Sequence, residues 1–190
     1  MIQGKAFIFT APSGSGKTTI VKHLLNSNPA LGFSISASTR DRRGRTEEHG
    51  KDYYFLSKEE FKRNIENDAF IEWEEVYTGN YYGTLKEEVQ RIWNEGRHVV
   101  FDVEVKGALK LKEYFGDDAL AIFVKVPSLE ELKKRLTGRG TESRESLSQR
   151  MYRAEFELTF ENKFDVTLLN ENLDDSFSRA DELVKNFLNQ

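Results

Sequence analysis

Short apolar runs alternate along the chain with segments whose apolar residues recur at helical spacing. The apolar runs at residues 6–9, 99–103, 120–126 and 166–169 are typical of strands buried on both faces of a sheet. Helical spacing is found in the segments at 17–25, 85–95, 128–136, 147–158 and 183–187. Because parallel strands need crossover helices, this alternation predicts an α/β core with a parallel sheet covered on both faces.

The stretch from residue 34 to residue 84 has a different pattern and predicts a small β-rich lobe. Residues 33–36 alternate between apolar and polar, the runs 53–56 and 70–73 are rich in aromatic residues, and Gly79-Asn80 marks a turn. One helix is expected inside the lobe, because Ser57 and Glu60 have the spacing of a capping box ahead of Phe61.

Composition limits the classes of protein that fit. A chain of 190 residues with 38% hydrophobic content supports one compact core with attached lobes. The net charge of -4 argues against a general nucleic-acid binder. The absence of cysteine excludes disulfides and zinc–thiolate sites, and it favours a reducing compartment, so we expect a cytoplasmic location. The apolar run at 6–9 is too short for a signal sequence or a membrane span, so we expect no membrane partner.

The first apolar run leads into a sequence with the spacing of a Walker A phosphate loop, in which Ala11 replaces the first glycine. Glycines allow successive backbone N–H groups to point at phosphate oxygens, and the following helix adds its positive end. Lys17 would meet the β- and γ-phosphates of a nucleotide, and the Thr18 hydroxyl would ligate Mg²⁺. A Gly/Ser turn that merely precedes a helix is the alternative, but the buried strand before it and the amphipathic helix after it favour the phosphate loop.

Asp102 follows the apolar residues 99–101 of the second run, as in the Walker B arrangement, where a carboxylate at a strand end faces the metal. Taken alone, an aspartate in this position is more often a turn residue. Together with the glycine loop, it is a candidate for metal or substrate contact.

Two groups of arginines are candidates for further phosphate contacts. Arg40, Arg42, Arg43 and Arg45 crowd one short loop, which as a charge run alone would be a solvated surface. Guanidinium groups suit bidentate capture of a phosphate monoester, and the hydroxyls of Tyr53 and Tyr82 would add donors. The second group, Arg135, Arg139 and Arg150, lies on two predicted helices and the glycine hinge at 138–140 between them. The arginine between the glycines would close over a nucleotide and meet charge on the transferred phosphoryl group.

With these features in order, the sequence resembles the guanylate kinase family over nearly its whole length. The stretches that carry the resemblance are 11–18, 33–40, 50–53, 70–73, 79–83 and 135–141, with Asn170. The resemblance implies an α/β P-loop fold with a three-layer parallel sheet core, a β-rich GMP-binding insertion and a helical lid. The implied divisions are core at 1–33, 85–128 and 158–190, a GMP-binding lobe at 34–84 and a lid at 129–157.

The resemblance also implies the reaction, which is Mg²⁺-dependent transfer of the γ-phosphoryl group of ATP to GMP by a monomer or homodimer. Catalysis would involve Lys17, Arg40, Arg139 and Arg150. ATP would be bound by Ala11, Pro12, Ser13, Gly14, Ser15, Gly16, Lys17, Thr18, Thr19, Arg135, Arg139 and Asn170. GMP would be bound by Ser36, Arg40, Arg43, Tyr53, Glu72, Tyr82, Thr84, Asp102 and Glu104. Mg²⁺ would be held by Thr18 and Asp102.

The chemistry of guanine agrees with the position of Glu72, because a carboxylate accepts from guanine N1–H and N2–H, whereas adenine presents an acceptor at N1. The chain departs from the family pattern at Glu104, where the family has aspartate, and Arg42 or Arg45 are alternatives to Arg43. Lys125 lies in a normally apolar stretch. A kinase acting on a sugar bisphosphate and a non-catalytic guanylate-kinase-like binding module remain alternatives.

Overall fold

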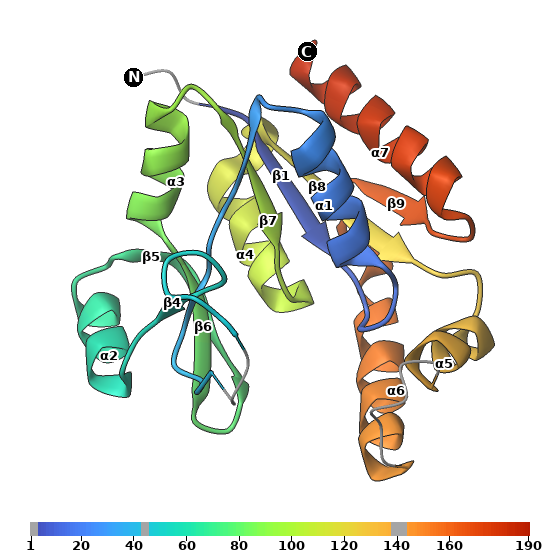
Figure 1. The fold of residues 1–190 in the computed structure, drawn as a ribbon, viewed down its shortest axis with the longest axis horizontal. Coiled ribbons are helices and arrows are strands. Elements are labelled where there is room, and N and C mark those ends of the chain that lie inside the picture. The colour runs from blue at the N-terminus through green and yellow to red at the C-terminus, as the bar shows by residue number, and fades with distance from the viewer. Residues whose placement is uncertain (1–3, 43–45, 138–143) are drawn as a thin grey trace.

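The core is a parallel sheet with strand order β2-β7-β1-β8-β9 (Figure 1). A computed structural model describes residues 4–42, 46–137 and 144–190, and within them this sheet has five strands. The strands are β1 (Ala6–Thr10), β2 (Leu31–Phe33), β7 (His98–Asp102), β8 (Ala119–Lys125) and β9 (Val166–Leu169). Each neighbouring pair runs parallel, which confirms the predicted parallel sheet.

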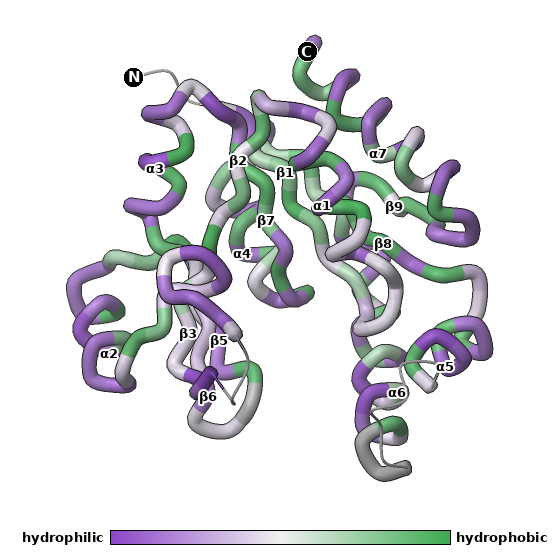
Figure 2. The backbone as a smooth tube through the Cα atoms, viewed as in Figure 1, coloured by the Kyte–Doolittle hydropathy of each residue, from purple (hydrophilic) through white to green (hydrophobic). Residues whose placement is uncertain are grey.

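Helices cover both faces of this sheet, and every side chain of its central strand, β1, is therefore buried. Phe7 and Phe9 of β1 pack in one cluster with α1 (Lys17–Ser27) and α7 (Leu173–Leu188). Ala6 and Ile8 point to the other face and pack with α3 (Lys86–Asn94) and α4 (Val105–Phe115). Figure 2 shows the hydrophobic residues concentrated along β1, β7 and β8, whereas both kinds of residue alternate along α3. The unbroken apolar run of β1 thus reflects burial on two faces, and the three-layer core is confirmed.

Two core elements differ from the sequence-based expectations. The helix α4 was not predicted, although Val105, Ala108, Leu111 and Phe115 recur on one face between lysines. The alternation at 33–36 does not form a strand of the lobe, because Phe33 ends β2 (Leu31–Phe33) at the edge of the core sheet, and residues 34–36 lie outside any strand. A strand this short has too few residues for a recognisable period.

The lobe contains a second sheet with strand order β4-β3-β6-β5. Its strands are β3 (Ala37–Ser38), β4 (Tyr54–Phe55), β5 (Phe70–Tyr77) and β6 (Asn80–Leu85). The helix α2 (Lys58–Glu66) begins at the predicted capping box, in which Ser57 Oγ accepts from the Glu60 N–H at 3.1 Å, and Glu60 accepts from the Ser57 N–H at 2.8 Å. Phe61 stacks on Phe70 beneath α2, so the lobe has a small apolar centre of its own.

On the other side of the core, α5 (Leu129–Thr137) and α6 (Arg144–Leu158) form a helical arm (Figure 1). Leu132 and Leu136 pack there against Ala154. Short 3-10 helices lie at η1 (Gly116–Asp118) and η2 (Glu161–Lys163). Lys125 forms an ion pair with Glu161 of η2 at 2.8 Å, which explains the charged residue at the end of β8. Within the described ranges, none of the helices has the length and apolar character needed to cross a membrane.

Candidate active site

The glycine loop and Asp102 meet at the carboxyl edge of the core sheet. The register pairs Phe9 of β1 with Asp102 of β7, so the loop that follows β1 starts beside the end of β7. Thr18 Oγ1 donates to Asp102 Oδ2 at 2.9 Å, and Lys17 Nζ forms an ion pair with Asp102 Oδ1. Lys17 Nζ also donates to the Val103 carbonyl at 3.0 Å. The structure therefore brings Lys17 and Thr18 of the glycine loop together with Asp102, a predicted site residue that is distant in the sequence.

The loop is held in shape by two glycines and by Asn170. Gly14 and Gly16 have φ of 93° and 87°, in the left-handed region that favours glycine. A Cβ on Gly16 would collide with the Asn170 amide nitrogen, which donates to the Ser15 carbonyl at 2.7 Å. Asn170 is 1% exposed and contacts the loop from the protein interior, so in this structure it supports the loop, and its role in binding ATP stays a prediction.

A hollow of about 300 Å³ opens over the glycine loop, and we call it the loop hollow. It is lined by the residues from Ala11 to Thr19, with Asp102, Glu104, Arg150, Arg153 and Glu157. Of the arginines expected at ATP, Arg150 reaches this hollow from α6. Arg135 instead pairs with Glu131 at 2.9 Å on its own helix, and Arg139 lies outside the described residues.

A larger hollow of about 440 Å³, the lobe hollow, lies between the core and the lobe. It is lined by Ser13, Lys17, Ser36, Arg40, Tyr53, Glu72, Glu74, Val76, Tyr82, Gly83, Asp102, Val103, Glu104 and Gly107. Both hollows share Ser13, Lys17, Asp102 and Glu104. The two spaces therefore adjoin at the end of the glycine loop, and Lys17 faces both.

Arg40 lines the lobe hollow with its guanidinium group. Its terminal nitrogens donate to both Glu47 carboxylate oxygens, at 2.8 and 2.6 Å, and the guanidinium lies over the Tyr53 ring at 4.7 Å. These hydrogen bonds raise the pKa of Arg40 above its usual value. The Tyr53 and Tyr82 rings are 6.1 Å apart, so the predicted arginine–tyrosine cluster is assembled. Arg43 and its alternative Arg45 lie outside the described residues, while Arg42 lies over the Phe55 ring at 5.0 Å.

Glu72 and Thr84 face each other across β5 and β6. Thr84 Oγ1 donates to Glu72 Oε1 at 2.7 Å, and both residues are buried. Burial raises the pKa of Glu72, although the Thr84 hydrogen bond partly opposes this shift. Gly107 of α4 is not among the predicted site residues, but it makes room for the carboxylate, because a Cβ there would lie 3.0 Å from Glu72 Oε2.

Glu104 contacts the helical arm. Its Oε2 accepts from Arg153 Nη2 at 2.9 Å, and Arg153 Nε donates to Glu157 Oε1 at 2.8 Å. The carboxylate that departs from the family pattern thus links the end of β7 to α6. Arg153 and Glu157 were not predicted, although they follow Arg150 at helical spacing and so share its face of α6.

The Glu157 carboxyl predicts a pH dependence of stability. Burial, and to a smaller extent the nearby Glu104, raise the pKa of Glu157 to about 7, although the hydrogen bond from Arg153 partly opposes this shift. Because the folded state binds this proton more tightly than the unfolded chain, its stabilising effect is full at acid pH. It is lost as the pH rises through about 7, at no more than about 1.4 kcal/mol per pH unit.

Glu157→Gln mimics the protonated carboxyl and is expected to remove this decline. Urea unfolding of both proteins between pH 5 and pH 8 measures it, with the exposed Glu155→Gln on the same helix as the control. An equal pH dependence in wild type and Glu157→Gln would contradict the prediction.

Comparison with known proteins gives one consistent family. The family model described as guanylate kinase matches residues 3–187. A curated guanylate kinase from Bacteroides thetaiotaomicron is 51% identical over 187 residues, which cover 98% of this chain and 91% of the relative. A curated guanylate kinase from Porphyromonas gingivalis is 51% identical over 170 residues, covering 89% of this chain and 90% of the relative.

A solved structure agrees with these relatives. The crystal structure of guanylate kinase from Anaplasma phagocytophilum superimposes with a TM-score of 0.74 and 26% identity, covering 98% of this chain and 87% of that chain. The matches take in the glycine loop, both hollows and α6, and the chain therefore belongs to the guanylate kinase family, the ATP:GMP phosphotransferases.

Proposed function

We propose that the chain binds the phosphates of ATP in the loop hollow and GMP in the lobe hollow, and that the γ-phosphoryl group passes between them beside Lys17. The observation that carries this proposal is that the two hollows adjoin and share Lys17 and Asp102. Phosphoryl transfer depends mainly on positioning and charge neutralisation, and both would be supplied at this junction.

On the donor side, Thr18 and Asp102 would hold Mg²⁺ together with phosphate oxygens of ATP. Both offer oxygen ligands, and their side-chain oxygens lie 2.9 Å apart, which suits an ion that takes few protein ligands alongside phosphate. In the part of the chain that the structure describes, no three acidic or histidine side chains cluster as a metal site, which also favours an ion that arrives with the nucleotide. When bound, Mg²⁺ supplies charge neutralisation on the phosphates.

On the acceptor side, Arg40, Tyr53 and Tyr82 would hold the GMP phosphate, with Ser36 and the Glu72–Thr84 pair at guanine. An oxygen of that phosphate attacks the γ-phosphorus, and the bond from the γ-phosphorus to the bridging oxygen of ADP breaks. The attacking oxygen is already ionised near neutral pH, so the step needs no general base. Lys17 meets the charge on the transferred group.

The helical arm would act as the lid. Arg150 of α6 already lines the loop hollow, and Arg135 lies on α5 of the same arm. Glu104 and Arg153 link this arm to the junction of the two hollows. The lobe at 34–84 would be the GMP-binding unit.

A coupled assay of ADP release tests the proposal with GMP, AMP, UMP, dTMP and ribose 1,5-bisphosphate as acceptors. We expect Mg²⁺-dependent turnover with GMP, and kcat/KM for AMP lower by about 10⁴-fold, because a site built to satisfy polar groups rejects a ligand that leaves them unpaired. Absence of turnover with GMP would refute the proposal, and a preference for the sugar bisphosphate would favour that alternative.

A further inference from the structure

The chain passes between the core and the lobe at two places. It enters the lobe through residues 34–36, between β2 and β3, and it returns where β6 ends at Leu85 and α3 begins at Lys86. Glu88 lies in the first turn of α3, next to the returning passage. A group that bonds to both passages holds the position of the lobe relative to the core.

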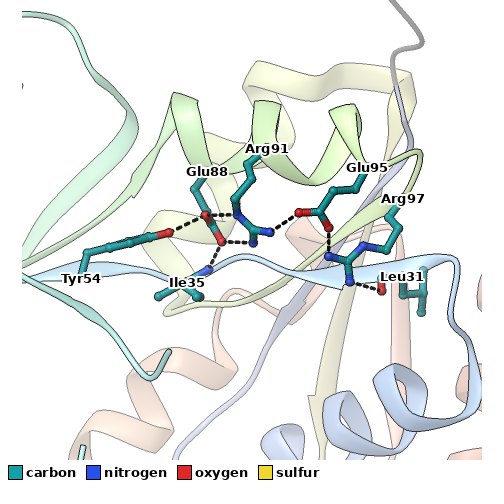
Figure 3. Close-up of polar contacts among 7 residues, drawn as sticks. All are labelled: Leu31, Ile35, Tyr54, Glu88, Arg91, Glu95 and Arg97. Atoms are coloured by element: carbon teal, nitrogen blue, oxygen red, sulfur yellow. Dashed lines mark hydrogen bonds and ion pairs between the residues drawn. The ribbon is translucent and has the colours of Figure 1, made fainter. Parts of the chain in front are cut away.

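Glu88 is such a group, and its carboxylate is 1% exposed. Oε1 accepts from the Ile35 N–H at 3.0 Å, on the entering passage, and Oε2 accepts from the Tyr54 hydroxyl at 2.8 Å, inside the lobe (Figure 3). Arg91, one turn further along α3, donates to both oxygens, at 2.8 and 2.9 Å. One carboxylate thus connects the core helix, the entering passage and a lobe strand.

Glu88 is ionised at neutral pH, which favours its hydrogen bonds to Ile35, Tyr54 and Arg91. Burial alone would raise the pKa of Glu88, but the hydrogen bonds from Arg91, Ile35 and Tyr54 outweigh burial and lower it below its usual value. Burial and the neighbouring carboxylate raise the pKa of Tyr54, so its hydroxyl keeps the proton that it donates. The connection is therefore intact at neutral pH.

The residues that Glu88 holds adjoin two residues of the lobe hollow. Ile35 precedes Ser36, Tyr54 follows Tyr53, and the Tyr54 N–H donates to the Ser36 carbonyl at 2.9 Å. Ser36 and Tyr53 both line the lobe hollow. A shift of Ile35 or Tyr54 would therefore move both lining residues together.

We propose that Glu88 is a positioning residue for GMP, which sets Ser36 and Tyr53 in the lobe hollow by holding Ile35 and Tyr54 against α3. The inference rests on the proposed function of the lobe hollow. Glu88 acts through its neighbours and on the acceptor side, so its loss affects GMP more than ATP.

Helix α3 provides two matched controls. Glu87 is exposed in the same first turn and shares the favourable interaction with the helix N-terminus, so Glu87→Ala tests for that effect. Glu95 pairs with Arg91 from the other side, at 2.7 Å, so Glu95→Ala tests for the loss of an Arg91 ion pair without loss of the contact to the lobe. Tyr54→Phe removes one arm of the connection and leaves Glu88 in place.

The experiment measures kcat and the KM for each nucleotide, with GMP affinity by calorimetry, on the full chain of each variant. For Glu88→Ala we expect the KM and Kd for GMP to rise by about tenfold or more, with the KM for ATP within about twofold of wild type. Glu88→Gln and Tyr54→Phe should show smaller rises in the same direction. Glu87→Ala and Glu95→Ala should match wild type.

An unchanged KM for GMP in folded Glu88→Ala, an equal rise for both nucleotides, or an equal effect of Glu95→Ala would overturn the inference. If Glu88→Ala does not fold, Glu88→Gln and Tyr54→Phe decide, and wild-type GMP values in both would overturn it. Wild type without GMP turnover would refute the proposed function, whereas active wild type with unaffected variants would refute only the role of Glu88.

Discussion

Replacing Lys17 by Met is expected to lower kcat by about a hundredfold to a thousandfold. Lys17 faces both hollows, so its ammonium is placed to neutralise charge on the phosphoryl group during transfer. Losing one preorganised group that stabilises transition-state charge typically costs this much in rate. Methionine keeps much of the length and the apolar stem of the side chain, so the fold should persist.

Steady-state kinetics at saturating nucleotide measure this loss. Lys22→Met is the matched control, because Lys22 is an exposed lysine on the same helix. Thermal unfolding of both variants shows whether the helix is intact. A kcat for Lys17→Met within about tenfold of wild type would show that Lys17 has no transition-state role.

Replacing Glu72 by Gln is expected to raise the KM for GMP by about a hundredfold, with little change in the KM for ATP. The carboxylate would accept two hydrogen bonds from guanine, whereas an amide presents a donor in place of one acceptor and leaves a buried polar group unpaired. The Thr84 hydroxyl can still donate to the amide oxygen, so the lobe sheet should remain intact.

Glu74→Gln is the control, because Glu74 lines the same hollow two residues along β5 and pairs with Lys106. It should change the KM for GMP far less than Glu72→Gln does. Because burial raises the pKa of Glu72, the KM for GMP in wild type should also rise as the pH is lowered, and this trend should be lost in Glu72→Gln. A Glu72→Gln enzyme that keeps the wild-type preference for GMP over AMP would show that Glu72 does not recognise guanine.

Local features were predictable because their residues are contiguous. The glycine loop, the strand before it and the helix after it occupy residues 6–27, and their spacing alone indicates a phosphate site. The capping box at Ser57 and the strand at Val166–Leu169 were likewise predicted from neighbouring residues. The helix α4 was missed although its apolar residues share one face, because lysines separate them along the sequence, and β2 was missed because it is only three residues long.

The sequence by itself determined the α/β class, the phosphate loop and, through the family resemblance, the residue types expected at the two nucleotides. Only the tertiary structure decided which of these residues meet. It joined Lys17 to Asp102, brought Gly107 against Glu72, turned Glu104 towards Arg153 and made Glu88 the link between core and lobe. The physical reason is that a local pattern depends on backbone periodicity, whereas a buried carboxylate is satisfied by whichever donors the packing brings to it, often from distant parts of the chain.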